Sequence, residues 1–276
     1  MKRLVLSAMS RVGTTLSHRQ RRFILDELHL GNMMGRLAEN EFDEVSLPNG
    51  VMITINPLFH AQMADGGQLA YETDVLAAIE HNLAPGGTFY DVGANVGVFS
   101  FIAADRVGPQ GAVCAFEPEE NNLVCFRRTL QRSKLKNLAL YDVAVGAADG
   151  TLTFDRRGGA FSGRLVASGD EARGATATVR VRSIDSLVRQ GAPAPSLVKI
   201  DVEGGEGDVL AGMVETLQAH GPTVLCELHF FNREGVSRTL DTLAAAHYVC
   251  RDLSGKTIAP GKDLAGVPRH ILAAPI

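Results

Sequence analysis

The sequence contains only four cysteines, and no two of them form a C-x-x-C motif of the kind found in many structural zinc sites. Cys114, Cys125, Cys226 and Cys250 are widely scattered and lie mostly in apolar stretches. We therefore expect four buried thiols in a reducing compartment, and no metal site. A zinc site or a disulfide pair is the less favoured alternative.

Long apolar runs and a strong net charge are also lacking. No apolar run approaches the roughly 20 residues that cross a bilayer, which predicts a soluble, cytoplasmic protein without a transmembrane segment. The formal net charge of -4 gives no sign of nucleic-acid binding. The chain has 276 residues, of which 45% are hydrophobic, enough for one large domain or for one domain with an appendage.

The stretch FYDVGANVGVFSF, from Phe89 to Phe101, has the pattern of a strand, a tight turn and a helix start. Glycines such as Gly93 and Gly97 let the backbone approach a ligand where a Cβ atom would clash, and the free amides of a helix start suit a polar group. Glu117 ends a second apolar run, GAVCAFE, where an acid can accept both hydroxyls of a ribose. The pattern indicates a binding site for a nucleoside cofactor.

Two of the three glycines of a dinucleotide-binding motif are missing from this turn, which argues against NAD. A dinucleotide fingerprint needs G-x-G-x-x-G, but counting from Gly93 places Asn95 and Val98 at the second and third positions. S-adenosylmethionine (SAM) carries a sulfonium and an ammonium instead of a pyrophosphate. The acidic Asp91 beside the turn therefore favours SAM. A glycine-rich loop that binds no ligand is the other interpretation.

Three sequence blocks together resemble the FkbM-like family of SAM-dependent methyltransferases. They are GGTFYDVGANVGVFSF (86–101), CAFEPEENN (114–122) and LVKIDVEGGEGDVLAGM (197–213), and the third is the most specific. The resemblance covers roughly residues 71 to 275. It implies SAM as the cofactor and a class I methyltransferase fold, whose sheet carries an antiparallel hairpin at one edge.

The order of predicted elements agrees with an α/β fold, because strands that alternate with helices imply a parallel sheet covered on both faces. We expect a Rossmann-like, mostly parallel sheet of seven strands. The predicted strands are 89–92, 112–117, 139–142, 197–201, 223–228, 247–251 and 270–274. A first helix is predicted to start at Thr73 or Asp74, either of which could cap it. Two further helices are predicted over 96–105 and 119–133. Alternating residues over 150–182 predict a hairpin with a mobile loop.

Residues 1–70 are predicted to form an N-terminal helical extension and a small β-hairpin, ahead of a methyltransferase domain over 71–276. The hairpin is expected from Val45 to Ile55, with Asn49 and Gly50 in its turn. The first 22 residues hold six basic side chains and no acid. A docked helical extension that could mediate homo-oligomer formation is favoured here over a membrane-surface helix or a transit segment.

Residues at the carboxyl ends of the first three strands are the candidates for cofactor binding, since ligands bind beyond these ends in such sheets. We expect Glu117 to accept the ribose hydroxyls and Asp142 the adenine amino group, although either acid could instead cap a helix. The resemblance also implies that Glu72 reaches the methionine amine of SAM. The full predicted set is Glu72, Asp91, Gly93, Ala94, Asn95, Gly97, Glu117, Pro118, Asp142 and Val143.

Methyl transfer to a hydroxyl also needs a group that takes the proton. The candidates follow the fourth and fifth strands, namely Asp201, Glu203, Glu227 and His229, with the lone histidine also open to a purely structural role. Glu206 is expected in the first turn of the next helix, where the helix dipole favours an acid.

The acceptor itself is not specified by the sequence. The resemblance suggests O-methylation of a small molecule, a sugar, another glycan or a secondary metabolite. A loop with Phe161, Ser162 and Arg164 and the segment 60–68 are expected to cover the site. The alternatives are a non-catalytic SAM-binding protein and an NAD-dependent oxidoreductase.

Overall fold

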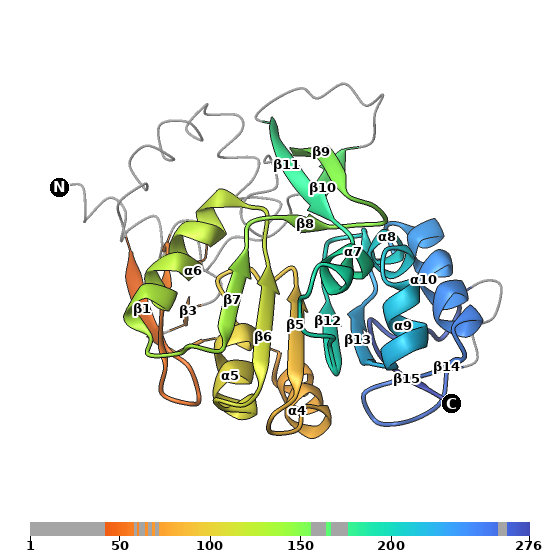
Figure 1. Cartoon of the computed structure of the whole chain (residues 1–276), viewed down its shortest axis with the longest axis horizontal. Helices are drawn as coiled ribbons and strands as arrows, with labels where there is room; N and C mark the ends of the chain where they lie inside the picture. Colours follow the sequence, from red (N-terminus) through yellow and green to blue (C-terminus); the bar gives the residue numbers. More distant parts are fainter. Residues whose placement is uncertain are drawn as a thin grey trace.

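A seven-stranded β-sheet forms the centre of the structure, a computed structural model that describes residues 42–57, 60, 64–65, 68–69, 72–155, 164–166, 176–258 and 264–276 (Figure 1). The strand order is β14-β15-β13-β12-β5-β6-β7. In this order the strands span Tyr248–Arg251, His270–Pro275, Thr223–Glu227, Leu197–Ile200, Thr88–Val92, Ala112–Phe116 and Leu138–Tyr141. Strands β13, β12, β5, β6 and β7 run parallel, and β15 is antiparallel to both of its neighbours.

The predicted Rossmann-like methyltransferase sheet is therefore confirmed, including its antiparallel pair at one edge. The structure adds that β15, the last strand in sequence, is inserted between β13 and β14. Each predicted strand differs from the observed one by a single residue at one end or at both. As a result Glu117, Asp142 and Asp201 lie in the loops directly after their strands, while Asp91 lies within β5.

Helices cover both faces of the sheet (Figure 1). Side chains such as Phe89 and Val113 pack with α4 (Thr73–Asn82), α5 (Val98–Val107) and α6 (Glu120–Arg132). Their sequence neighbours Tyr90 and Cys114 point to the other face, because successive side chains of a strand alternate. That face is covered by α7 (Ile184–Arg189), α8 (Glu206–Ala211), α9 (Val214–His220) and α10 (Arg233–Ala245).

Two predicted helix starts need correction. Helix α4 has Glu72 at its N-cap position, and the Glu72 side chain makes no capping hydrogen bond, so neither Thr73 nor Asp74 caps this helix. Helix α5 begins at Val98, two residues later than expected, because Gly97 adopts a φ of 94° that a helix interior cannot contain. None of the helices in the described ranges is long and apolar enough to cross a membrane.

The predicted N-terminal hairpin is present as β1 (Asp43–Ser46) and β2 (Met52–Ile55), which pair in antiparallel fashion. Gly50 supplies the positive φ of the turn, at 81°. The hairpin packs on α6, where the Thr54 amide donates a hydrogen bond of 2.8 Å to the Thr129 hydroxyl. Two short strands, β3 (Ala64–Asp65) and β4 (Gln68–Leu69), extend this small sheet. The predicted basic extension lies outside the described residues.

A second small sheet follows β7. It contains β8 (Ala144–Val145), β9 (Gly150–Asp155), β10 (Arg164–Val166) and β11 (Thr176–Arg182) in the order β10-β9-β11-β8. The antiparallel pairing of β9 with β11 confirms the predicted hairpin. Phe161 and Ser162 of the expected lid lie outside the described residues.

Candidate active site

A cavity of about 410 Å³ opens beyond the carboxyl ends of the parallel strands, where such sheets bind their ligands. Seven of the predicted site residues line it: Gly93, Asn95, Glu117, Pro118, Val143, Asp201 and Glu203. The rest of the wall comes from Val92, Phe116, Glu119, Asn122, Ala144, Val145, Val202, Gly204, Gly205, Asp208, Phe231 and Asn232. The other predicted residues, which are Glu72, Asp91, Ala94, Gly97, Asp142, Glu227 and His229, lie outside this wall.

The turn after β5 approaches the end of β12 very closely. Gly93 has a φ of 80°, and a Cβ atom placed on it would lie 1.8 Å from the carbonyl oxygen of Asp201. Only glycine fits both the backbone conformation and the space. Asn95, two residues later, also has a positive φ, of 53°, which is uncommon outside glycine and is found at functional sites.

Gly97 and Ala94 stabilise this turn on the side that faces away from the cavity. A Cβ atom on Gly97 would meet the Phe126 and Phe101 rings at 2.6 and 2.8 Å, so this glycine lets α5 pack on α6. The Ala94 amide donates to the Phe116 carbonyl at 3.0 Å. Both residues shape the turn, and neither reaches the cavity.

Glu117 joins two turns at the edge of the cavity. Its buried carboxylate accepts hydrogen bonds from the Asn95 amide at 2.7 Å and from the Glu119 amide at 2.8 Å. Burial raises the pKa of Glu117 to about 7, although these hydrogen bonds favour the charged form and act in the opposite direction. A buried carboxylate beside a nucleoside-sized cavity is suited to accept hydroxyl donors.

Asp91 points away from the cavity, towards α5. Its carboxylate accepts a hydrogen bond of 2.6 Å from the Ser100 hydroxyl and lies 3.5 Å from the ammonium of Lys199, the residue opposite it in β12. Lys199 also lies 3.4 Å from Asp201. Burial of Lys199 disfavours its charge, but Asp201 and Asp91 outweigh this effect and raise its pKa. The ion pairs connect the β5 turn to the acidic end of β12.

Lys199 was not among the predicted site residues. Its signal in the sequence is a lysine inside the otherwise apolar strand LVKI, since a buried lysine requires acidic partners.

Asp142 lies at the surface next to the cavity. Its carboxylate pairs with Arg180 and lies 3.5 Å from Arg127. Its neighbour Val143 lines the cavity, as expected for a side chain packed against an adenine ring. Adenine binding by Asp142 therefore stays a prediction, and it requires that the carboxylate leave one of these arginines.

An imidazole surrounded by acids follows β13. His229 is hydrogen-bonded through Nδ1 to Glu206 at 2.8 Å, and its Nε2 lies 3.3 Å from Glu227 and 3.5 Å from Glu203. Burial lowers the pKa of His229, but the adjacent carboxylates outweigh burial and raise it to about 10. Glu206 is in the first turn of α8, as predicted, and in addition orients the imidazole.

Glu203 combines three features of a reactive group. It lines the cavity, 36% of its side chain is exposed, and its φ of 54° places it in the left-handed region. Burial and the negative charges of Asp201, Glu227 and Glu206 raise its pKa to about 7, with His229 acting in the opposite direction. A strained carboxylate with such a pKa is typical of functional sites.

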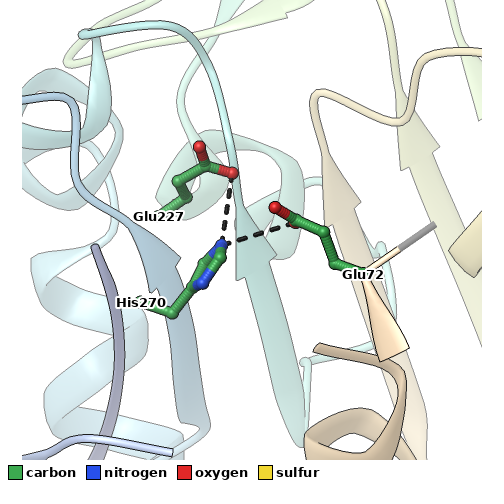
Figure 2. A group of neighbouring side chains, drawn as sticks. All are labelled: Glu72, Glu227 and His270. Carbon is green, nitrogen blue, oxygen red and sulfur yellow. Dashed lines mark ion pairs between the residues drawn. The ribbon is translucent and has the colours of Figure 1, made fainter. Parts of the chain in front are cut away.

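A further group of charges adjoins the acids around His229. Glu227 pairs there with Arg269, and Figure 2 shows Glu227 and Glu72 on either side of His270. Glu227 accepts a hydrogen bond of 2.6 Å from Arg269 Nε. Burial disfavours the Glu227 carboxylate, but His229, His270 and Arg269 outweigh this effect and hold its pKa below the usual range. Arg269 and His270 were not predicted, because they lie far in sequence from every motif.

The amino-acid sequence also matches a known protein family. A family model described as the methyltransferase FkbM domain matches residues 91–250. Hexuronic acid methyltransferase AglP from Haloferax volcanii is 29% identical over 161 residues, which are 57% of this chain and 62% of the relative. The chain thus aligns with less than two thirds of that protein.

Solved structures of methyltransferases show a distant likeness. An FkbM methyltransferase from Methylobacillus flagellatus KT is 16% identical with a TM-score of 0.44, covering 73% of this chain and 52% of the other. A precorrin-6y C5,15-methyltransferase from Geobacter metallireducens GS-15 is 15% identical with a TM-score of 0.45, covering 76% and 92%.

Proposed function

The chain belongs to the FkbM family of methyltransferases, as its sequence motifs predicted, and from this premise we propose that it transfers a methyl group from SAM to a hydroxyl of a small molecule or glycan. The observation that carries the proposal is the continuity of the cavity. One wall holds Glu117 and the glycine turn, and the same cavity continues to Asp201 and Glu203.

The first of these walls fits the cofactor. We assign the ribose hydroxyls to Glu117, the adenine ring to Val143 and the methionine part to the turn at Gly93 and Asn95, all of which line the cavity. The volume, about 410 Å³, lies in the range of small-molecule sites. When bound, SAM supplies an electrophilic methyl group, and the nearby Asp201 favours its positive charges.

The second wall fits a proton acceptor. Transfer to a hydroxyl requires an acceptor oxygen aligned with the methyl carbon and a base within hydrogen-bond reach of its proton. Among the four candidates only Asp201 and Glu203 line the cavity, and Asp201 is engaged by Lys199. We assign the role of proton acceptor to Glu203, whose pKa of about 7 suits general-base catalysis near neutral pH.

The related hexuronic acid methyltransferase supports a sugar as the acceptor class. A ring with several hydroxyls offers the nucleophile together with neighbouring groups that the cavity can orient. The exposed ring of Phe231 lies in the cavity wall beside Glu203 and Gly204 and provides an apolar face for such a ring.

A transfer assay with trideuteromethyl SAM tests this function. Purified full-length protein is incubated with the labelled donor and a panel of free and glycosidically linked neutral sugars and hexuronic acids. We expect one acceptor to gain the labelled methyl as an ether, with an equal amount of S-adenosylhomocysteine formed. Label recovered on an amine or a carbon would contradict O-methylation, and label recovered as a methyl ester of a carboxylate would contradict transfer to a hydroxyl.

A further inference from the structure

Three potential metal ligands from distant parts of the chain converge next to the acids around His229. Glu72 precedes α4, Glu227 ends β13, and His270 begins β15. Figure 2 shows the two carboxylates and the imidazole pointing towards one another. One ligand atom of each residue lies within 4.8 Å of those of the other two.

The distances within this triad are those of ion pairs, longer than the usual hydrogen bond. His270 Nε2 lies 3.4 Å from Glu72 Oε2 and 3.4 Å from Glu227 Oε2, which is beyond the usual hydrogen-bond range of 2.7–3.2 Å. The Nε2 atom is buried and has no hydrogen-bond partner among the described residues. Ligands bound to one ion at about 2.0–2.2 Å lie roughly 3–3.5 Å apart, so both distances from His270 Nε2 fit joint coordination.

The Arg269 guanidinium faces the other oxygen, Oε1, of each carboxylate. Glu227 Oε1 accepts from Arg269 Nε at 2.6 Å, and Glu72 Oε1 lies 3.7 Å from the same guanidinium. This leaves both Oε2 atoms directed at His270. Partners that bind the outer oxygen of a ligating carboxylate orient it in metal sites.

The three side chains of the triad differ in their exposure to solvent. The side chains of Glu227 and His270 are 6% and 13% exposed, whereas that of Glu72 is 39% exposed. Two ligands are thus held by the sheet, and the third lies on the solvent side. An ion could enter past Glu72, and three protein ligands leave positions for water or another oxygen ligand.

From this geometry we propose that Glu72, Glu227 and His270 bind one divalent transition-metal ion through two carboxylate oxygens and one imidazole nitrogen. The mixed ligand set favours Zn²⁺, Co²⁺ or Mn²⁺ over Ca²⁺ and Mg²⁺, which prefer oxygen ligands alone. The ion ties the start of α4 to the ends of β13 and β15. The site stands independently of the methyl donor and of the acceptor.

The test is a Co²⁺ titration of the chelator-treated full-length protein, followed by the visible absorption of the ion and by calorimetry. We expect saturable binding of one Co²⁺ per chain, displaced by Zn²⁺. His270→Gln should weaken binding by more than about 100-fold, beyond the roughly 10–100-fold cost of losing an outer-shell partner. Glu72→Gln, at the solvent side of the site, should weaken it in the same direction and serves if the His270 variant does not fold.

His229→Gln is the matched control, since His229 belongs to a neighbouring group with Asp201 and Glu203 that also has metal-ligand spacing. We expect this variant to lose no more than the roughly 10–100-fold of an outer-shell partner, because His229 Nε2 lies 3.3 Å from the ligand Glu227. Binding that is lost in His229→Gln but kept in His270→Gln would place the ion elsewhere and overturn the proposal. Absence of saturable binding to the wild type, or equal binding by folded Glu72→Gln, would overturn it as well.

Discussion

Replacing Glu203 with glutamine is expected to lower the turnover of methyl transfer by about 10²–10⁴-fold, the usual contribution of a positioned base. The SAM dissociation constant should stay within about threefold, because Glu203 lines the cavity and we assign it to the acceptor instead of to the cofactor. Glutamine keeps the size of the side chain but cannot take the proton. Turnover measurements beside calorimetric SAM binding separate the two effects.

The pH dependence gives a second readout of the same prediction. Burial raises the pKa of Glu203 to about 7, and only its carboxylate form accepts a proton, so wild-type turnover should rise as the pH increases through about 7. The residual turnover of Glu203→Gln should lack this rise. Glu215→Gln, an exposed acid on α9 paired with Arg189, is the matched control and should behave as wild type. Near-full turnover of Glu203→Gln would show that the proton is taken by another group.

Replacing Gly93 with alanine is expected to abolish measurable SAM binding and to destabilise the domain by about 2–5 kcal/mol. The positive φ of 80° accounts for one part, and the Cβ atom at 1.8 Å from the Asp201 carbonyl for the larger part. Relief of this clash requires the β5 turn and the β12 end to separate, which deforms both walls of the cavity. Chemical denaturation and calorimetry measure the two effects.

Gly108→Ala controls for the backbone conformation alone. Gly108 also has a positive φ, of 66°, but no atom lies within 4 Å of a Cβ atom placed there. We expect a loss of about 1–3 kcal/mol without any change in SAM affinity, because a φ of 66° with a ψ of -172° is essentially restricted to glycine. If Gly93→Ala were no worse than Gly108→Ala, the close approach of the two walls would not matter for the cofactor.

Much of the fold could be predicted because local signals and tertiary structure agree. Apolar runs of four to six residues alternated with helical segments, and glycines marked the turns that the structure uses. The insertion of β15 between β13 and β14 could not be derived locally, since nothing within a strand tells which neighbour it will have.

The site was predicted in part for the same reason. Gly93 and Asn95 belong to one local strand–turn–helix pattern, Glu117 directly follows the next strand, and all three line the cavity. Asp91 lies in the same pattern, but the alternation of β5 turns its side chain to the face covered by α5, where Lys199 pairs with it. His270 and Arg269 meet Glu227 only through tertiary contacts, so no spacing in the sequence could indicate them.

Calorimetric titration of the wild type and Glu117→Ala with SAM, S-adenosylhomocysteine and NAD tests the cofactor assignment most directly. We expect the wild type to bind one SAM or S-adenosylhomocysteine per chain and to show no saturable binding of NAD. Glu117→Ala should remain folded and lose about 1.5–3 kcal/mol of SAM binding energy, the range for hydrogen bonds to a charged group. Saturable NAD binding without binding of either adenosyl compound would contradict the account.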